Sequence, residues 1–144
     1  MTTAVKIGLG VEFAVGDGAS PEVFTKVAEV LSVGGPSLSR DTPEATHTDS
    51  TAGYKEFIAG LKDGGEVTVN MNFLPADASQ DLSTGLLGDF GTDTLINYKI
   101  TFPYSPTVAW TFAGFITGFE PDVPIEDRMT ASVTFKVSGQ PTLA

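Results

Sequence analysis

The residue types that carry out most enzyme chemistry are scarce in this sequence. It contains a single histidine, His47, and no cysteine, which excludes thiolate nucleophiles, thiolate metal sites and disulfides. It also lacks a G-x-S-x-G nucleophile elbow and a phosphate-cradling glycine loop. A lone histidine in a polar stretch is typical of a solvated side chain. The sequence therefore predicts a protein that is not an enzyme and that needs no cofactor.

The densest acidic group comprises Asp122, Glu126 and Asp127, within the stretch FEPDVPIEDR. Carboxylate oxygens are the ligands that Ca²⁺ prefers. However, this stretch contains two prolines and lacks the residue spacing of a calcium loop, so we interpret it as a solvated turn. Trp110 lies on the apolar face of a predicted strand, and we expect it in the core rather than in a ligand platform.

The charge balance argues against nucleic-acid binding. The chain has 18 acidic and 8 basic residues, a formal net charge of −10, and no basic cluster. Its two arginines, Arg40 and Arg128, are far apart in sequence, whereas tight binding of DNA or RNA requires clustered cations at the phosphates. The acidity serves either solubility or a specific function. No apolar stretch approaches the roughly 20 residues that span a bilayer, so we expect no membrane insertion.

The length of 144 residues and the 41% hydrophobic content predict one domain over residues 1–144. Alternation of apolar and polar residues predicts a mainly β, antiparallel fold, because side chains of a strand point to opposite faces in turn. In residues 66–74, for example, Val67, Val69 and Met71 share the apolar face. The predicted strands cover residues 5–15, part of 23–33, 66–74, 94–104, 108–119 and 129–138, with a hairpin turn at 103–106.

One flanking helix is predicted over residues 78–90. Asp77 or Ser79 can cap its start, Leu82, Leu86 and Phe90 recur every four residues, and a glycine follows. A shorter helical turn is indicated at residues 54–61. Between the strands, residues 34–53 form a long polar segment with almost no large apolar side chains. Such a segment is either a floppy surface hairpin or an arm that becomes ordered against a neighbouring molecule.

Two non-enzymatic classes fit this pattern: a monomeric ligand-binding β-barrel, and a structural subunit that assembles through its sheet edges. A closed barrel of the first class needs eight to ten strands, and about six are predicted. An open sheet has exposed edges, which are a liability unless another chain covers them. The strand count therefore favours the assembling subunit.

Two long stretches of the chain combine several motifs in a definite order. The first is SRDTPEATHTDSTAGYKEFIAGLKDGGEVTVNMNF, in which a polar arm leads to G-L-x-D-G-G-E-V and an alternating strand. The second is TFPYSPTVAWTFAGFITGFEPDVPIEDRMTASVTFKVSG, which ends in the S-V-T-F-x-V-S-G strand. Together they cover most of residues 5–139, and they resemble the lambda-like family of major tail tube proteins of long-tailed phages. We expect the single-domain form, without the C-terminal immunoglobulin-like domain of the lambda protein.

The resemblance implies a β-sandwich or barrel flanked by one helix. It implies hexameric rings that stack into a hollow tube of a phage or gene transfer agent tail, made in the cytoplasm of a bacterial host. Implied partners are other copies of the chain, the tape measure protein, and the tail terminator and baseplate proteins, while DNA passes through without specific binding. The related alternative is a secretion-system tube, whose cargo is protein.

Site residues follow from the resemblance and from the strand pattern. Because the polar segment lacks apolar anchors, we expect it to become ordered against an adjacent ring. The residues concerned are Arg40, Asp41, Thr42, Thr48, Asp49 and Ser50, which belong to the first of the two stretches that carry the resemblance. A conduit for duplex DNA is wider than one chain can enclose, so several chains must contribute strands. The polar faces of these strands meet either the lumen or the outer solvent. The lumen-facing candidates are Glu66, Thr68, Asn70, Asn72, Thr130, Ser132 and Thr134.

Overall fold

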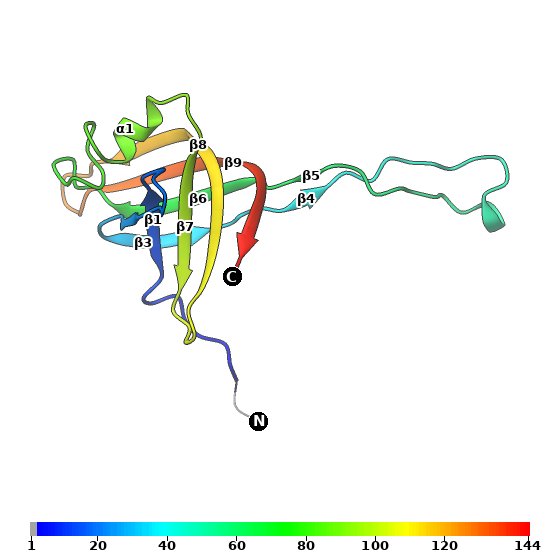
Figure 1. Cartoon of the computed structure of the whole chain (residues 1–144), viewed down its shortest axis with the longest axis horizontal. Helices are drawn as coiled ribbons and strands as arrows, with labels where there is room; N and C mark the ends of the chain where they lie inside the picture. Colours follow the sequence, from blue (N-terminus) through cyan, green and yellow to red (C-terminus); the bar gives the residue numbers. More distant parts are fainter. Residues whose placement is uncertain (1–2) are drawn as a thin grey trace.

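The structure is a computed structural model that describes residues 3–144, and Figure 1 shows a β-rich body with one long projecting hairpin. Its elements are β1 (Glu12–Gly16), β2 (Phe24–Lys26), β3 (Val30–Gly34), β4 (Ser39–Arg40), the 3₁₀ turn η1 (Thr51–Gly53), β5 (Lys62–Asp63), β6 (Glu66–Asn72), α1 (Leu86–Phe90), β7 (Ile96–Phe102), β8 (Val108–Asp122) and β9 (Thr130–Leu143).

Seven strands form one antiparallel sheet in the order β2-β1-β7-β8-β9-β6-β3. The sheet bends over itself: β1 and β9 are three strands apart, about 14 Å in a flat sheet, yet the ring centroids of Phe13 and Phe135 are 5.0 Å apart. Tyr98 of β7 also packs on Phe135, at 4.7 Å. In Figure 1, β1 and β7 run across the direction of β6 and β9, as in an orthogonal β-sandwich.

The two longest strands make this bend. The pairing of β8 with β9 shifts register between Thr111 and Ala113 and again between Ile116 and Gly118, and such bulges bend strands. Between the shifts, a side chain at Gly114 would bring its Cβ into a clash with the carbonyl oxygen of Lys136. Only glycine permits this close approach. The prediction of a mainly antiparallel sandwich or barrel with one helix is confirmed, and the sheet is not closed, since β2 and β3 remain free edges.

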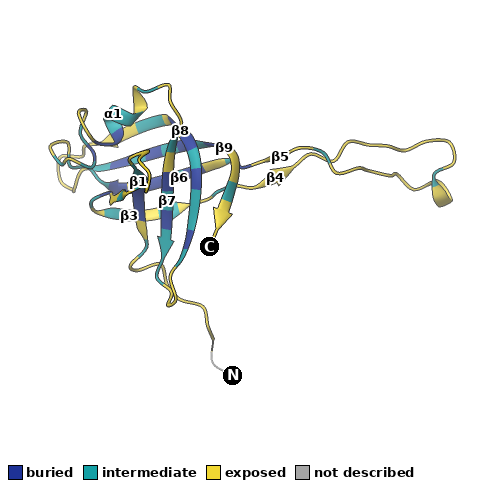
Figure 2. Ribbon diagram, in the orientation of Figure 1, coloured by how far each residue is buried: buried dark blue, intermediate teal, exposed yellow. Residues whose placement is uncertain are grey.

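Four predicted strands are confirmed: residues 66–74, 94–104, 108–119 and 129–138 correspond to β6, β7, β8 and β9. Their apolar faces are buried as the alternation predicted, with Val67, Val69 and Met71 fully inaccessible. Figure 2 shows this burial confined to the body. Residues 23–33 contain two strands, β2 and β3, rather than one.

The predicted strand over residues 5–15 is wrong in its first half. Only β1 is a strand, and Val5, Ile7 and Leu9 are 79%, 77% and 82% exposed. Their alternation is typical of a strand, but alternation supplies no partner. No described segment of this chain forms a ladder with residues 5–9.

The predicted helix over residues 78–90 is also shorter, since α1 begins only at Leu86. Upstream, aspartates hold turns: Asp77 Oδ1 accepts from the amide and hydroxyl of Ser79, and Asp81 Oδ1 accepts from the amides of Thr84 and Gly85. Such side-chain bonds compete with helical ones. They also hold the pKa of both carboxyls below its usual range. Leu86 is buried as predicted, whereas Leu82 is exposed.

A buried glutamine fastens this loop to the sheet. Gln80 is fully inaccessible. Its Oε1 accepts from the amide of Leu74 at 2.9 Å, and its Nε2 donates to the carbonyls of Ala28 and Asn72, both at 3.0 Å. Because all these bonds are made, the polar side chain is accommodated in the core region.

The projecting hairpin comprises residues 38–62, which we call the arm. Its base is the β4–β5 ladder, in which Ser39 faces Asp63 and Arg40 faces Lys62. The helical turn predicted at residues 54–61 is wrong, because this stretch is the extended returning leg of the arm. All of it except Gly60 is exposed, as Figure 2 shows. The arm is therefore longer than the predicted polar segment, and its second leg is not polar.

The difference in burial between the two faces of β6 gives the first testable prediction. Val67→Asp places a charge in the core without a partner, which costs at least several kcal/mol, so we expect an unfolded subunit. Asn70→Asp, on the exposed face of the same strand, should fold. Circular dichroism and thermal unfolding of both variants measure the difference. Equal tolerance of the two charges would contradict the strand faces described above.

The carboxyl group of Asp89 predicts that the stability of the fold depends on pH. Burial raises the pKa of its carboxyl to about 6 from 3.8, so the native state holds the proton more tightly than the unfolded chain. The stability that this tighter binding provides is complete below about pH 4 and is lost as the pH rises through 6. Asp89→Asn should therefore raise the melting temperature at pH 7.5 and change it little at pH 3.5. Asp93→Asn, on the exposed loop that follows α1, controls for the removal of one negative charge from the chain.

Candidate assembly surfaces

The predicted lumen-facing residues lie together on one face of two adjacent strands. The register of β6 with β9 sets Thr68 opposite Thr134, and Asn70 opposite Ser132. The same register continues at both ends of the pair. Its complete polar face consists of Glu66, Thr68, Asn70, Asn72, Thr130, Ser132, Thr134 and Lys136. All seven candidates thus form one continuous polar face, on the side of the sheet away from the aromatic core.

The polar face extends onto the neighbouring strands β3 and β8. Asn70 Nδ2 donates to Ser32 Oγ at 3.0 Å, and Asn72 Nδ2 donates to Glu29 Oε1 at 3.1 Å. On the other side, the β8 residue Glu120 lies opposite Ser132. Sequence reasoning missed Glu120 because it ended the β8 strand at residue 119, and it missed Ser32 and Glu29 because it could not tell which strand pairs with β6. The available signal was Glu120 itself, a polar residue in the stretch that was interpreted as a turn but belongs to β8.

The electrostatics of this face are acidic. Lys136 is its only base among the β6 and β9 positions, and its Nζ lies 2.9 Å from Asp63 Oδ1. The pKa of Asp63 is lowered first by the amide of Gly65 and then by Lys136. This ion pair offsets the lysine charge. Glu66 and Glu120 are both exposed and form no ion pair among residues 3–144.

A hydrogen-bonded ladder runs the length of the arm. The amide of Gly60 donates to Asp41 O at 2.7 Å, the amide of Ile58 donates to Pro43 O at 2.9 Å, and the amide of Ala45 donates to Glu56 O at 2.7 Å. A two-stranded ribbon without a core satisfies its backbone but buries little. From Asp41 to the tip, eight residues at about 3.3 Å each reach roughly 25 Å from the body.

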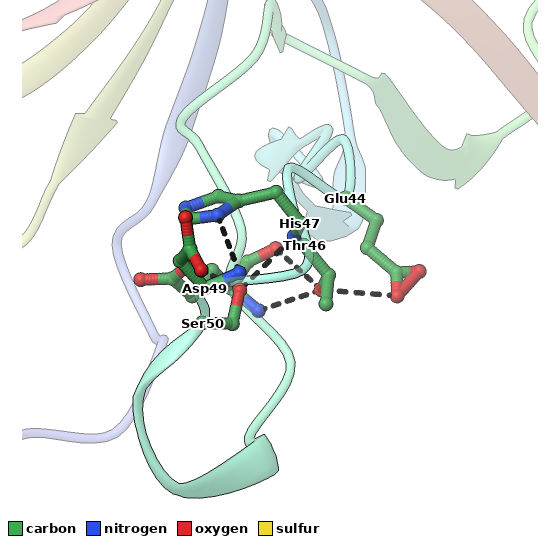
Figure 3. A network of polar contacts seen from close by, with 6 residues as sticks. Glu44, Thr46, His47, Asp49 and Ser50 are labelled. Atoms are coloured by element: carbon green, nitrogen blue, oxygen red, sulfur yellow. Dashed lines mark hydrogen bonds and ion pairs between the residues drawn. The ribbon is translucent and has the colours of Figure 1, made fainter.

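The tip of the arm is held by polar side chains, shown in Figure 3. Ser50 Oγ donates to Glu56 Oε2 at 2.6 Å, and His47 Nε2 lies 3.2 Å from the same oxygen. His47 Nδ1 accepts from the amide of Asp49 at 3.2 Å. Both ring nitrogens of the histidine are therefore engaged in shaping the turn. The His47 side chain is 61% exposed, in keeping with the predicted solvated residue, and its contacts shape the tip.

The six predicted arm residues divide between two places. Arg40, Asp41 and Thr42 lie near the base of the arm, while Thr48, Asp49 and Ser50 form the tip. The structure does not bring these two groups together. Sequence reasoning also missed the apolar side chains of the returning leg, because their spacing resembled a helix. They are Tyr54, Phe57, Ile58 and Leu61, which are 75%, 58%, 58% and 84% exposed.

No metal or membrane feature emerges from the part of the chain that the structure describes. Within residues 3–144, no three His, Asp or Glu side chains are grouped closely enough to hold a metal ion, and this includes Asp122, Glu126 and Asp127. In the same range, every helix is too short and too polar to cross a membrane.

Solved structures with this fold come from tail tubes and injection systems. The tail of an empty GTA (gene transfer agent) particle with C6 symmetry matches with a TM-score of 0.76 at 15% identity, covering 97% of this chain and 99% of that one. The SPP1 tail tube matches with a TM-score of 0.68 at 14% identity, covering 95% and 77%. A sheath–tube complex of an extracellular contractile injection system matches with 0.65 at 16% identity, covering 100% and 99%. These similarities show a shared fold.

The family is shown by the sequence itself. No significant match was found among curated protein sequences. However, residues 10–144 match the family model described as lambda phage tail tube protein. The match includes the polar face, the arm and the core strands, and it confirms the resemblance found in the two long stretches above. The chain therefore belongs to the lambda phage tail tube protein family and is a structural component of a phage or phage-like tail.

Proposed function

We propose that six copies of the chain form a ring and that the rings stack into a hollow tube through which DNA leaves the particle. The observation that carries this proposal is the continuous polar face of β6 and β9, which contains all seven lumen candidates on one open sheet. Sixteen to eighteen strands enclose only a porin-sized channel. A wider conduit therefore needs strands from several subunits, and the free edges of this sheet allow subunits to be joined.

The chemistry of the polar face suits the passage of DNA. Phosphates bind where lysine and arginine gather, and the one lysine on this face is paired with Asp63. Short hydroxyl and amide side chains occupy most other positions. A wall of this kind gives the phosphate backbone no cationic site at which to stop. The subunit accordingly acts as a conduit and not as an enzyme or a specific DNA-binding protein.

The arm connects one ring to the next in this proposal. It projects from one end of the body (Figure 1), and its returning leg exposes four large apolar side chains. Exposed apolar groups at this density are typical of an interaction site. Further partners are the tape measure protein inside the tube, and the terminator and baseplate proteins at its ends.

A protein-conducting injection tube is the second candidate, favoured by the fold shared with the contractile injection system. The contents of purified particles separate the two candidates. Nuclease-protected DNA in the particles supports the phage-like tail. Particles that carry a protein cargo and no DNA support the injection tube.

The arm proposal predicts a separation of folding from assembly. Phe57→Ser with Ile58→Ser should leave the melting temperature almost unchanged, because neither side chain is buried in the subunit. The same variant should fail to form tubes, as judged by negative-stain electron microscopy and sedimentation. Leu82→Ser, which removes a similarly exposed leucine from the body, is the control and should assemble. Normal tubes from the arm variant would overturn the assignment.

The lumen proposal predicts a salt-sensitive defect in delivery. Glu66→Lys with Asn70→Lys places cations at two exposed positions of the polar face and should permit tubes of normal length. DNA delivery should slow markedly, and higher salt should relieve the defect because phosphate contacts weaken with ionic strength. Asp93→Lys with Thr94→Lys makes the same change in charge on a loop and should deliver normally. Wild-type delivery by the first variant would show that this face is not the lumen wall.

A further inference from the structure

A groove of about 570 Å³ lies where the arm joins the body. Leu38 and the β4–β5 ladder form one side, while Trp110 of β8 and Pro141 of β9 form the other. Trp110 packs against the core but is only partly buried, so part of its ring surface remains available in the groove. The groove therefore combines apolar walls with the polar base of the arm.

Two cations in this groove form no ion pair with any residue of the described range 3–144. Arg40 and Lys62 lie directly opposite each other in the β4–β5 register, and both line the groove. Like charges at facing positions of an antiparallel ladder destabilise it. Lys26 and Lys136 pair with Glu12 and Asp63, but neither of the groove cations forms an ion pair among residues 3–144. Asp63 also lines the groove, but its carboxylate pairs with Lys136. In a chain of net charge −10, the two cations that form no ion pair within the described residues indicate an acidic occupant from outside the subunit.

The same chain carries a segment of matching chemistry. Residues 123–127, in the turn between β8 and β9, expose Val123 and Ile125, the latter completely. Glu126 and Asp127 follow directly, and both are exposed. Pro124 restricts the backbone of this turn, which lowers the entropy lost when it docks. The segment therefore presents apolar and acidic groups together, as the groove requires.

The groove and the turn lie at opposite ends of the subunit and cannot meet within one chain. The turn adjoins Thr130 at the start of β9, whereas the groove includes Gly139 and Pro141 near its end. From Thr130 to Gly139, nine residues of strand span about 30 Å. Figure 1 shows the arm and the orange turn between β8 and β9 at the two ends of the body.

We propose that the groove at the base of the arm receives residues 123–127 of a second copy, with Glu126 and Asp127 facing Arg40 and Lys62. The interface is heterologous, since each copy uses a different surface, and repetition of such a contact builds a filament. The proposal rests on the assembly proposed above and identifies its docking partner. Because the arm leaves the body beside the groove, the docked copy is the one along which the arm runs, in the next ring.

Charge exchange tests the pairing. Arg40→Glu with Lys62→Glu should raise the critical concentration for tube formation on the order of tenfold, since each exposed ion pair contributes modestly. Glu126→Lys with Asp127→Lys should do the same. The protein that carries all four changes regains opposite charges and should regain assembly. As a control, Lys6→Glu and Lys26→Glu are combined with Glu126→Lys and Asp127→Lys. This protein has the same net charge as the fourfold exchange, but its new acidic residues lie away from the groove, so it should not regain assembly.

Cysteine pairing tests the geometry in the same tubes. The natural chain has no cysteine, so every disulfide formed reports the introduced positions. Ile125→Cys in one protein and Gln140→Cys in another, mixed before assembly and oxidised afterwards, should give a cross-linked dimer on a non-reducing gel. Thr117→Cys in place of Gln140→Cys is the control, because Thr117 is exposed on β8 but does not line the groove, and it should give none.

The outcomes separate this inference from the proposed function. Wild-type tubes, together with no rescue by the fourfold exchange and no cross-link between positions 125 and 140, would overturn the docking and leave the conduit intact. Failure of the wild-type protein to form tubes at all would instead contradict the proposed function. Rescue together with the cross-link supports the docking of residues 123–127 in the groove.

Discussion

The contact of Phe135 with Phe13 and Tyr98 is the interaction on which the rest of the structure depends. It joins strands that lie up to three positions apart in one sheet, and so it holds the sheet bent over itself. The aromatic rings fill the concave side and bury large apolar areas. The convex side consequently carries the alternate, polar positions of β6 and β9, beside which Phe115 of β8 lies opposite Lys136. Without the bend, the apolar face would need a second layer, and no element in the described chain is large enough to supply it.

Sequence alternation predicted the parts of the fold in which the local pattern and the partner agree. Val67, Val69 and Met71 alternate and are buried, because β9 and β3 pair with β6 on both sides. Val5, Ile7 and Leu9 alternate equally well, yet residues 5–9 remain outside the sheet. Strand formation needs a neighbouring strand, and a local pattern does not record whether one exists. The lumen candidates lie together for a related reason. Alternate residues of a strand share one face, and the register of β6 with β9 places the polar residues of both strands on the same face of the sheet.

The errors in the helical segments have a related cause. Spacing of apolar residues by three and four predicts a helix only if the backbone has no stronger local partner. Asp77 and Asp81 provide such partners to nearby amides and hold residues 77–85 in turns. In residues 54–61 the competing partner is the other leg of the arm, through bonds such as Ile58 N to Pro43 O. The groove was not foreseeable, since Trp110, Lys62 and Pro141 are distant in sequence and only the bend of β8 and β9 brings them together.

The nitrogen-bearing side chains of the polar face donate hydrogen bonds to other side chains of the same subunit, so the face offers few free nitrogen donors to DNA. Asn70 and Asn72 direct their amide groups to Ser32 and Glu29, and Lys136 directs its ammonium to Asp63. A donor already engaged within the sheet gains little from a phosphate, because the new bond only replaces an existing one. Excess negative charge alone would repel DNA but would also destabilise a ring of like subunits. A face whose cation is paired and whose amide nitrogens donate within the sheet avoids both problems, since it neither holds the phosphates nor depends on strong repulsion to keep them away.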